Sequence, residues 1–200
     1  YLNKIFFKRW FIMLGLIDLD TGNLASLESA LKKLNIKYKV CRNSFDFEKT
    51  DKIILPGVGA FADFMKKIEE RGFKKIILNK INNKIPFLGV CVGFQVLFSE
   101  SMEHGHCKGL NVINGKIVNF NEFSKNIKVP HVGWNQCKIV QKNQLFNGIE
   151  NLSDFYFTHS YIVKNNLPET TIAETEYEIN FVSAVMKENV YGVQFHPEKS

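Results

Sequence analysis

The chain has 200 residues, of which 45% are hydrophobic and 23% are charged, and its formal net charge is +6. This balance is ordinary for one globular domain with a sizeable core. Although the charge is positive, the lysines alternate with acidic residues and form no basic stripe with exposed aromatics, so we expect no nucleic-acid partner. No apolar run reaches the roughly eighteen residues that span a bilayer, and we expect no membrane segment.

The N-terminal stretch Tyr1–Phe11 is basic and aromatic. It lacks the apolar core and small-residue cleavage site of a signal peptide. We therefore predict an N-terminal extension at residues 1–12, a single domain at residues 13–200, and a cytoplasmic protein.

The first two-fifths of the chain alternate between strand and helix patterns. Short apolar runs predict buried strands at Met13–Asp18, Lys37–Cys41, Lys52–Leu55 and Ile85–Val90. Apolar residues at helical spacing predict helices that begin at Leu24, Phe61 and Phe73, and a further helix through Phe94–Ser99. This alternation predicts an α/β fold with a mostly parallel central sheet and helices on both faces.

After about residue 108 the pattern changes to strands. Leu110–Phe120 contains Asn114-Gly115, a strong short hairpin signal. Further strands are predicted at Lys138–Val140, Phe155–Val163, Thr171–Glu174, Phe181–Lys187 and Val190–Phe195, the last two joined by a tight turn at Glu188-Asn189. We expect an antiparallel, strand-rich second half that extends the sheet or adds a second one.

The four cysteines, Cys41, Cys91, Cys107 and Cys137, have no repeating spacing and predict free thiols in a reducing compartment. Near one of them, His104, His106 and Cys107 form an H-x-H-C cluster that could bind zinc if a fourth ligand converged. No second ligand pair lies nearby in the sequence. We predict no metal and no cofactor.

The segment GVCVGFQ, Gly89–Gln95, lies where a buried strand turns into a helix. A nucleophile at such a turn is raised above the carboxyl edge of the sheet. Glycine is required at Gly89 and Gly93 because a Cβ there would clash with neighbouring elements, and the start of a helix favours the thiolate of Cys91. By itself the motif also fits a structural cysteine between two packing glycines.

The last predicted strand ends in His196-Pro197-Glu198. Active sites in parallel sheets lie at the carboxyl ends of strands, so His196 can come near Cys91. A cysteine nucleophile needs a base, and the base needs a partner such as Glu198 to orient it. Considered without the cysteine segment, a surface histidine beside an incidental glutamate is the alternative.

The segment Pro56-Gly57-Val58-Gly59 follows the third predicted strand. Attack on an amide creates an oxyanion, and glycines let backbone N–H groups turn towards it. We interpret Gly57, Val58 and Gly59 as an oxyanion hole. A plain strand-ending turn is the alternative.

Together, GVCVGFQ and the terminal FHPEKS resemble the class I (triad) glutamine amidotransferases. The resemblance implies that Cys91 attacks the glutamine carboxamide, with His196 as acid and base and Glu198 as its orienting carboxylate. It also implies substrate contacts at Gln95, His159, Ser160 and Tyr161.

Two further segments, VPHVGWN (Val129–Asn135) and FYFTHSY (Phe155–Tyr161), are similar to the glutaminase subunit of imidazole glycerol phosphate synthase. That family implies a heterodimer with a (β/α)8-barrel cyclase, which uses ammonia in histidine biosynthesis. It also implies a partner interface that contains Gly22, Asn23, Trp134 and Lys199. From the residues alone, Trp134 fits a core aromatic equally well.

Three features depart from that family, the first being the N-terminal eleven residues, for which it has no counterpart. Asp18–Thr21 stands where the family usually has an aromatic residue and a glycine near the interface, and the family normally continues past Ser200 into a final helix, so we expect a truncated sequence. A paralogous subunit that supplies ammonia to another synthase, such as one forming amidino sugars for surface polysaccharides, is therefore the alternative function. The intact triad argues against a non-catalytic module, and a cysteine peptidase would leave VPHVGWN unexplained.

Overall fold

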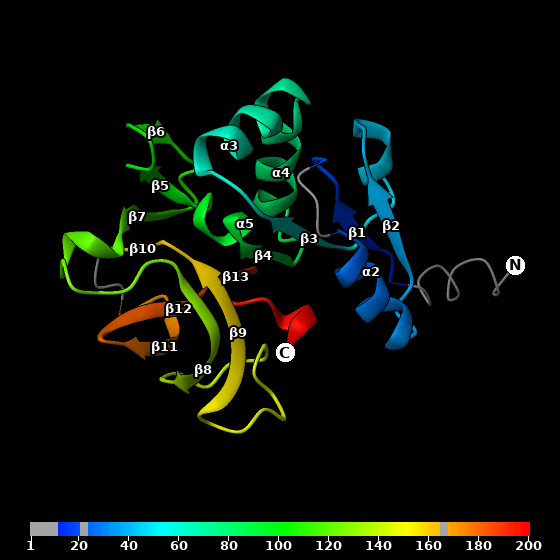
Figure 1. Cartoon of the computed structure of the whole chain (residues 1–200). Coiled ribbons are helices and arrows are strands. Elements are labelled where there is room, and N and C mark those ends of the chain that lie inside the picture. Colours follow the sequence, from blue (N-terminus) through cyan, green and yellow to red (C-terminus); the bar gives the residue numbers. More distant parts are fainter. Residues whose placement is uncertain (1–11, 21–23, 165–167) are drawn as a thin grey trace, which may run out of the picture.

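The computed structural model describes residues 12–20, 24–164 and 168–200. Within these residues a nine-stranded sheet runs in the order β2-β1-β3-β4-β13-β12-β11-β8-β9 (Figure 1). A smaller sheet of the described residues has four strands in the order β10-β7-β5-β6.

The larger sheet changes from parallel to antiparallel at β13. Its parallel strands are β2 (Tyr38–Cys41), β1 (Leu14–Ile17), β3 (Lys52–Gly57), β4 (Phe87–Cys91) and β13 (Val190–Val193). Its antiparallel strands are β12 (Ile179–Lys187), β11 (Thr171–Tyr177), β8 (His131–Ile139) and β9 (Ser153–His159). The predicted α/β fold with an antiparallel second half is confirmed.

Helices cover both faces of the parallel strands. Leu16 packs with Leu27 and Leu31 of α2 (Leu24–Lys33). The next strand residue, Ile17, points to the opposite face and belongs to the core that contains Phe64. That core includes α3 (Phe61–Glu70) and α4 (Phe73–Asn82), which lie together above the sheet in Figure 1. No helix in the described part of the chain is long and apolar enough to cross a membrane.

In the smaller sheet the structure differs from the sequence predictions. It consists of β5 (Phe98–Ser101), β6 (Cys107–Lys108), β7 (Ile113–Asn119) and β10 (Tyr161–Val163). The predicted helix through Phe94–Ser99 is wrong, because α5 covers only Val92–Gln95 and the chain then enters β5. The residues between, Val96 and Leu97, are completely buried, so this segment has no polar face for an amphipathic helix.

The predicted hairpin at Asn114-Gly115 is also wrong. Both residues lie inside β7, which pairs with β5 on one side and β10 on the other. A Cβ on Gly115 would lie 2.8 Å from Cδ1 of Phe98. The glycine therefore allows close packing of two strands and makes no turn.

Several strand boundaries differ from their predicted positions. Ser160 separates β9 from β10, so the predicted strand Phe155–Val163 is divided between the two sheets. Strand β8 begins at His131, seven residues before the predicted start. Strand β3 continues through Pro56, where only β4 pairs with it because the β1 register ends at Ile54.

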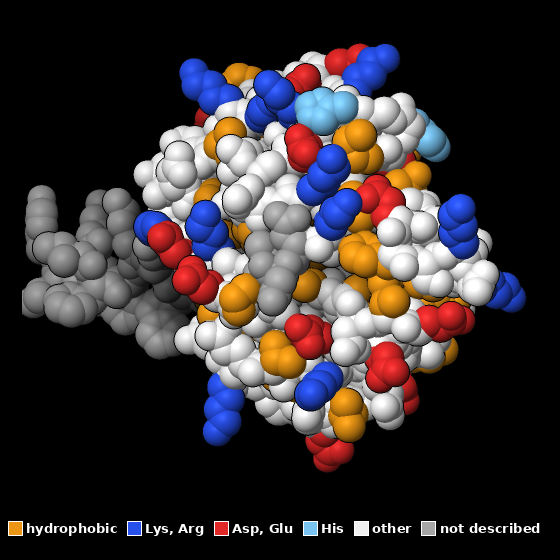
Figure 2. Space-filling model, turned by 90° about the vertical axis from the view of Figure 1, so that its left-hand side faces the viewer, with side chains coloured by type: hydrophobic (Ala, Val, Ile, Leu, Met, Phe, Trp, Pro, Cys, Tyr) orange, Lys and Arg blue, Asp and Glu red, His pale blue; other side chains and the backbone are white. Residues whose placement is uncertain are grey.

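Three short 3-10 helices complete the described elements: η1 (Ser44–Phe47), η2 (Phe120–Glu122) and η3 (Pro197–Lys199). At the surface, lysine and arginine side chains are interspersed with acidic ones on the face drawn in Figure 2. That face carries no continuous basic stripe.

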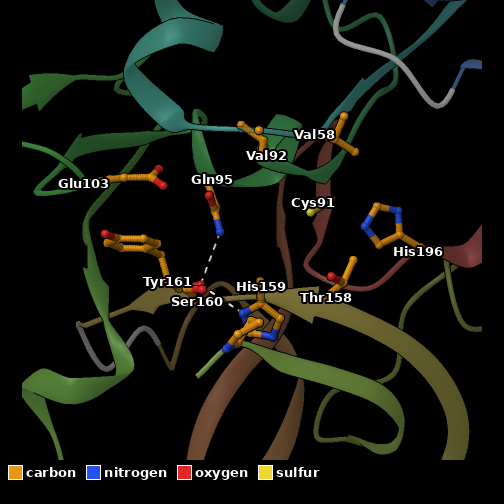
Figure 3. A pocket seen from close by; sticks show the side chains of 12 residues that line it. Val58, Cys91, Val92, Gln95, Glu103, Thr158, His159, Ser160, Tyr161 and His196 are labelled. Atoms are coloured by element: carbon orange, nitrogen blue, oxygen red, sulfur yellow. Dashed lines mark hydrogen bonds between the residues drawn. The ribbon is translucent and has the colours of Figure 1, made fainter. Parts of the chain in front are cut away.

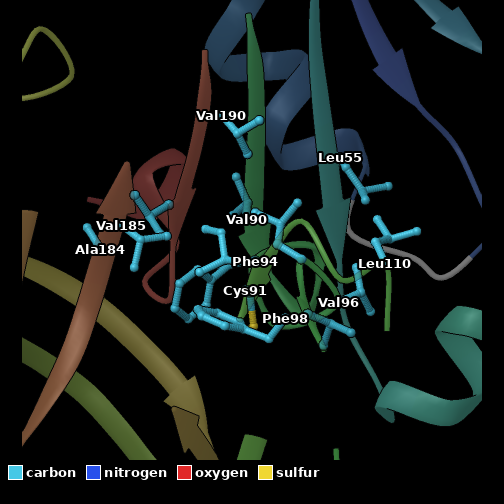
Figure 4. Close-up of a cluster of buried hydrophobic side chains, with 14 of the residues drawn as sticks. Leu55, Val90, Cys91, Phe94, Val96, Phe98, Leu110, Ala184, Val185 and Val190 are labelled. Carbon is cyan, nitrogen blue, oxygen red and sulfur yellow. The ribbon is translucent and has the colours of Figure 1, made fainter. Parts of the chain in front are cut away.

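The end of β4 rests on an aromatic core. Phe94 and Phe98 lie close to Cys91 among the side chains of β3, β4, β12 and β13 (Figure 4). Their rings meet edge to face, with centroids 5.1 Å apart and planes at 86°. The segment that carries Cys91 is therefore anchored in the interior.

Candidate active site

Cys91 occupies a strained turn between β4 and α5. Its backbone has φ 55° and ψ −110°, a combination that a residue with a Cβ rarely adopts. The predicted turn at the end of a buried strand is thus present, although the helix after it is a single turn.

The two glycines that flank this turn leave no space for a side chain. A Cβ on Gly93 would lie 1.9 Å from the carbonyl oxygen of Leu55, and one on Gly89 would lie 2.3 Å from that of Gly93. Both contacts are with backbone, which cannot move aside cheaply. The prediction that a Cβ would clash here is confirmed.

Strand β13 delivers His196 to the same edge of the sheet. β13 runs parallel to β4 with Val193 opposite Val90, so both chains leave the sheet side by side. Figure 3 shows the imidazole of His196 beside Cys91. Nδ1 of His196 lies 2.9 Å from Oε1 of Glu198, and both side chains are almost completely buried.

The surroundings of His196 favour its charged form. Burial lowers its pKa, but the contacts with Cys91 and Glu198 outweigh burial and raise the pKa to about 9. Burial raises the pKa of Glu198, and the hydrogen bond and charge of His196 reverse this and lower it overall. Nε2 of His196 has no hydrogen-bond partner among the described residues. It is therefore the nitrogen that can exchange a proton with Cys91 or a substrate.

A pocket of about 280 Å³ opens over Cys91. Its lining residues are Val58, Gly59, Cys91, Val92, Gln95, Glu103, Pro130, Thr158, His159, Ser160, Tyr161 and His196 (Figure 3). The structure thus brings together residues that the sequence placed in the triad, the oxyanion segment and the substrate site. A concave site with a few converging polar groups suits a small polar ligand.

The predicted oxyanion segment lies next to the nucleophile. Gly57 is opposite Cys91 in the register of β3 and β4. Val58 and Gly59 line the pocket, and Gly59 has φ 97°, a conformation that favours glycine. The backbone between β3 and α3 therefore borders the space above the sulfur.

The predicted substrate residues are joined by hydrogen bonds. Nε2 of Gln95 donates to the carbonyl oxygen of Tyr161 at 3.2 Å. Nδ1 of His159 lies 3.0 Å from the same oxygen. Both interactions are drawn in Figure 3, where Ser160 lies at the junction of β9 and β10. The side chains of two of the four predicted residues, Gln95 and His159, therefore meet on the backbone carbonyl of a third, Tyr161.

The sequence predictions missed several polar residues at the site, among them Gln194 and Glu103. Gln194 is completely buried, and its Nε2 donates to Sγ of Cys91 at 3.8 Å. The signal available was a lone amide side chain between Val193 and Phe195 in an apolar strand. Glu103 lines the pocket, and its Oε2 accepts a 2.7 Å hydrogen bond from the N–H of Phe61 at the start of α3. Nothing in the loop sequence distinguished it.

The predicted interface residues Trp134 and Lys199 share one surface. Trp134 is 58% exposed, so its interpretation as a core aromatic is wrong. Its ring centroid lies 6.0 Å from that of Tyr156, and Nζ of Lys199 lies 5.0 Å from the Tyr156 ring. The other two predicted interface residues, Gly22 and Asn23, lie outside the described residues.

The acidic segment that departs from the family pattern is bound by arginines. Asp18 is buried, with Oδ2 2.9 Å from Nε of Arg42. Arg71 donates to the carbonyl oxygen of Asp18 at 3.2 Å and also pairs with the carboxylate of Asp20. Both carboxylates are thus paired within the chain, and Thr21 lies outside the described residues.

The H-x-H-C segment has another partner. His106 Nε2 lies 2.8 Å from Oε2 of Glu100. The described ranges contain no group of three or more histidine, cysteine or acidic side chains that could hold a metal ion.

Comparison with known proteins shows the family of the chain. The family model for class-I glutamine amidotransferases matches residues 15–200. Solved structures with the same fold include a glutamine amidotransferase, 18% identical with a TM-score of 0.74 over 94% of this chain and 91% of that one. PurLQS from Thermotoga maritima, 15% identical, also has a TM-score of 0.74 over 94% and 88%. The chain belongs to the class-I glutamine amidotransferase family.

Within that family, the chain is similar over nearly its whole length to HisH subunits of imidazole glycerol phosphate synthase. It is 41% identical to subunit HisH 1 of Campylobacter jejuni strain 81-176 over 94% of this chain and 93% of that protein. It is 44% identical to HisH of Methanocaldococcus jannaschii over 94% and 92%.

Proposed function

We propose that the protein is the glutaminase subunit of an imidazole glycerol phosphate synthase. It hydrolyses L-glutamine to glutamate and ammonia and passes the ammonia to a (β/α)8-barrel cyclase in histidine biosynthesis. The observation that carries the proposal is the buried His196–Glu198 pair beside Cys91 on its strained turn, in a chain 40 to 44% identical to HisH subunits. Such an enzyme works in the cytoplasm.

The triad performs the reaction in two steps. The Cys91 thiolate attacks the carboxamide carbon, and N–H groups of the Gly57–Gly59 segment stabilise the oxyanion. His196 donates a proton to the nitrogen as the C–N bond breaks, which releases ammonia and leaves a glutamyl thioester. Neutral His196 then takes a proton from water, the resulting hydroxide attacks the thioester, and the thiolate leaves. Glu198 holds the imidazole and stabilises its charged form throughout.

The pocket supplies complementary groups for the rest of glutamine. Gln95 and the backbone around Ser160 offer polar contacts. Glu103 is the carboxylate among the pocket residues and suits the α-ammonium group of the substrate. A hydrogen bond from the N–H of Phe61, the first residue of α3, holds the Glu103 carboxylate in place.

The surface around Trp134 is the proposed docking site of the cyclase. Trp134 and Lys199 both lie next to Tyr156, whereas the predicted interface residues Gly22 and Asn23 lie outside the described part of the chain. Tyr156 is connected to the triad because its carbonyl oxygen accepts the N–H of His196 at 2.8 Å. Ammonia that leaves Cys91 would be delivered into the partner, where it stays unprotonated and reactive.

The test uses the chain assembled with its cyclase partner. Cys91→Ala is expected to abolish product formation from glutamine and to leave the rate with ammonium salts within about twofold. Cys107→Ala, which removes a half-buried thiol elsewhere, is the matched control and should leave both rates unchanged. Glutamine-dependent turnover that survives in Cys91→Ala would refute the proposal.

A second acceptor for the ammonia is favoured by one observation, the arginine-bound Asp18–Asp20 segment. A paralogous subunit serving another synthase, such as one forming amidino sugars, could use this altered surface. Complementation of a histidine auxotroph decides between them. Growth supports the histidine pathway, whereas failure with soluble protein and intact glutaminase activity supports the other synthase.

A further inference from the structure

One backbone carbonyl fixes the orientation of the amides around the nucleophile. The oxygen of Tyr161 can only accept hydrogen bonds, and it lies 3.2 Å from Nε2 of Gln95. The amide of Gln95 must therefore turn its NH2 group towards Tyr161. The same NH2 group lies 3.0 Å from the side chain of Gln194. Because Gln95 donates at this contact, the facing atom of Gln194 has to be its acceptor oxygen.

These hydrogen bonds of Gln95 allow only one orientation of the Gln194 side-chain amide. With Oε1 facing Gln95, the NH2 group faces Sγ of Cys91 at 3.8 Å. Gln194 is completely buried, and Gln95 is 3% exposed, so no solvent competes for these bonds. A thiolate accepts such a bond fully, whereas a thiol accepts it weakly. The donor therefore favours the charged sulfur.

The same carbonyl is held from its other side by two buried histidines. His159 donates from Nδ1 to Tyr161, so its Nε2 must accept from Nδ1 of His131 at 3.1 Å. Nε2 of His131 then accepts from Asn135, whose Nδ2 lies 3.3 Å away. Protonation of either ring would bring two N–H groups together. Burial lowers the pKa of His131 to about 4 and that of His159 to about 3, so both rings stay neutral.

We propose that Gln194 is a positioning residue for the nucleophile, which directs a buried N–H donor at the Cys91 sulfur and thereby stabilises the thiolate in the resting site. Its orientation is set by the Gln95 amide and the Tyr161 carbonyl, and the His131–His159 pair holds that carbonyl in place. The inference rests on the proposed role of Cys91 as nucleophile. Gln194 acts through the sulfur and makes no contact that requires the substrate.

The test measures the reactivity of the sulfur in the full chain without glutamine. Iodoacetamide alkylates thiolates, and peptide mass spectrometry reports the rate at Cys91 separately from the other cysteines. Gln194→Met keeps the length of the side chain and removes the donor. Gln194→Glu keeps an acceptor for Gln95 and places a carboxylate against the sulfur. The other titratable groups of the pocket, His196, His159, Tyr161 and Glu103, are the same in all variants.

We expect alkylation of Cys91 at pH 7 to slow by about fivefold in Gln194→Met and by tenfold or more in Gln194→Glu. The midpoint of the pH–rate profile should rise by about one pH unit in the glutamate variant. Gln144→Glu, the same change at an exposed position, should leave the profile unchanged. Rates within twofold of the unmodified chain in both folded variants would overturn the proposal.

If either variant fails to fold, a measurement on the unmodified chain tests the proposal instead. The side-chain amide resonance of Gln194 should shift with pH as Cys91 ionises, and this titration should be lost in Cys91→Ser. A resonance that does not respond to Cys91 contradicts the inference. Alkylation and this resonance require no turnover, so they can fail while glutaminase activity stands, and they can succeed if the proposed function is wrong.

Discussion

The two walls of the active site are held by different forces. The wall that carries Cys91 is fixed by steric contacts, because Gly89 and Gly93 leave no space and the turn is strained. The wall that carries His196 is fixed by hydrogen bonds and charge, through Glu198 and through the backbone of Tyr156. We therefore expect the wall that carries Cys91 to tolerate no added side-chain volume and to be insensitive to pH. We expect the wall that carries His196 to tolerate changes of side-chain volume and to respond to changes of charge.

The largest effect should come from the steric wall. Gly93→Ala places a Cβ 1.9 Å from the carbonyl oxygen of Leu55, and we expect a loss of more than about 4 kcal/mol of unfolding free energy, or no folded protein. Urea denaturation measures it. Gly105→Ala is the matched control, because Gly105 has φ 114° but open space around it, and it should cost only about 1 kcal/mol. Equal costs at the two positions would contradict the steric account.

The charged wall should lose activity and keep its fold. In Glu198→Gln the imidazolium of His196 loses its partner, and we expect kcat to fall roughly 10³-fold, about 4 kcal/mol of barrier, with little change in KM. Steady-state kinetics in the assembled enzyme measures this. Glu188→Gln, on the exposed turn after β12, should leave kcat unchanged. A fall of less than tenfold in Glu198→Gln would show that the carboxylate does not orient the base.

The buried histidines should make stability depend on pH. The pKa values of His131 and His159 are lowered from 6.5 to about 4 and about 3, so their neutral forms stabilise the fold above pH 6.5, and this stability is lost as the pH falls. His196 has the opposite sign, since its pKa is raised to about 9 and its contribution is lost as the pH rises through that value. We expect unfolding free energy to be greatest near pH 6.5.

On the acid side the expected loss is roughly 2 to 3 kcal/mol between pH 6.5 and 5, measured by urea denaturation. His159→Asn should reduce this loss of unfolding free energy by about half. His104→Asn, at an exposed position, should leave this loss unchanged. A flat profile in the unmodified chain would mean that the two rings accept protons without loss of structure.

The smallest effect on the chain itself should come from Trp134→Ala. Since Trp134 is largely exposed, we expect unfolding free energy to change by less than about 0.5 kcal/mol. Affinity for the cyclase should nevertheless fall about tenfold or more, because buried tryptophans dominate interfaces. Phe45→Ala, at an exposed aromatic in η1, is the control and should change neither quantity. Unchanged affinity in Trp134→Ala would place the interface elsewhere.

The sequence predicted the glycines of the steric wall and the His196–Glu198 pair of the charged wall. The alternation of strands and helices up to residue 91 follows from local patterns of apolar residues, and the need for Gly89 and Gly93 follows from a strand that meets a helix. Local pattern failed at Phe94–Ser99, because a segment buried on all sides has no periodicity. It failed again at Asn114-Gly115, because the glycine there allows close packing against Phe98 in a neighbouring strand.

Contacts between distant residues explain what was missed at the site. Gln194 and Gln95 are 99 residues apart, and only the register of β13 against β4 brings the amide of Gln194 to Cys91. The role of His131 was also missed, because its partner His159 lies on the adjacent strand 28 residues later. The residues proposed as the triad could be predicted from their neighbours in sequence, the glycines around Cys91 and the terminal His-Pro-Glu segment.

Acid quenching shows whether Cys91 forms a covalent bond with glutamine. The assembled enzyme is mixed with glutamine, quenched in acid within one turnover, and digested for peptide mass spectrometry. We predict a glutamyl thioester on the peptide that contains Cys91, absent from Cys91→Ser and reduced in His196→Asn, where the leaving nitrogen lacks its proton donor. Turnover of glutamine with no adduct on Cys91, or an adduct on another residue, would contradict the account.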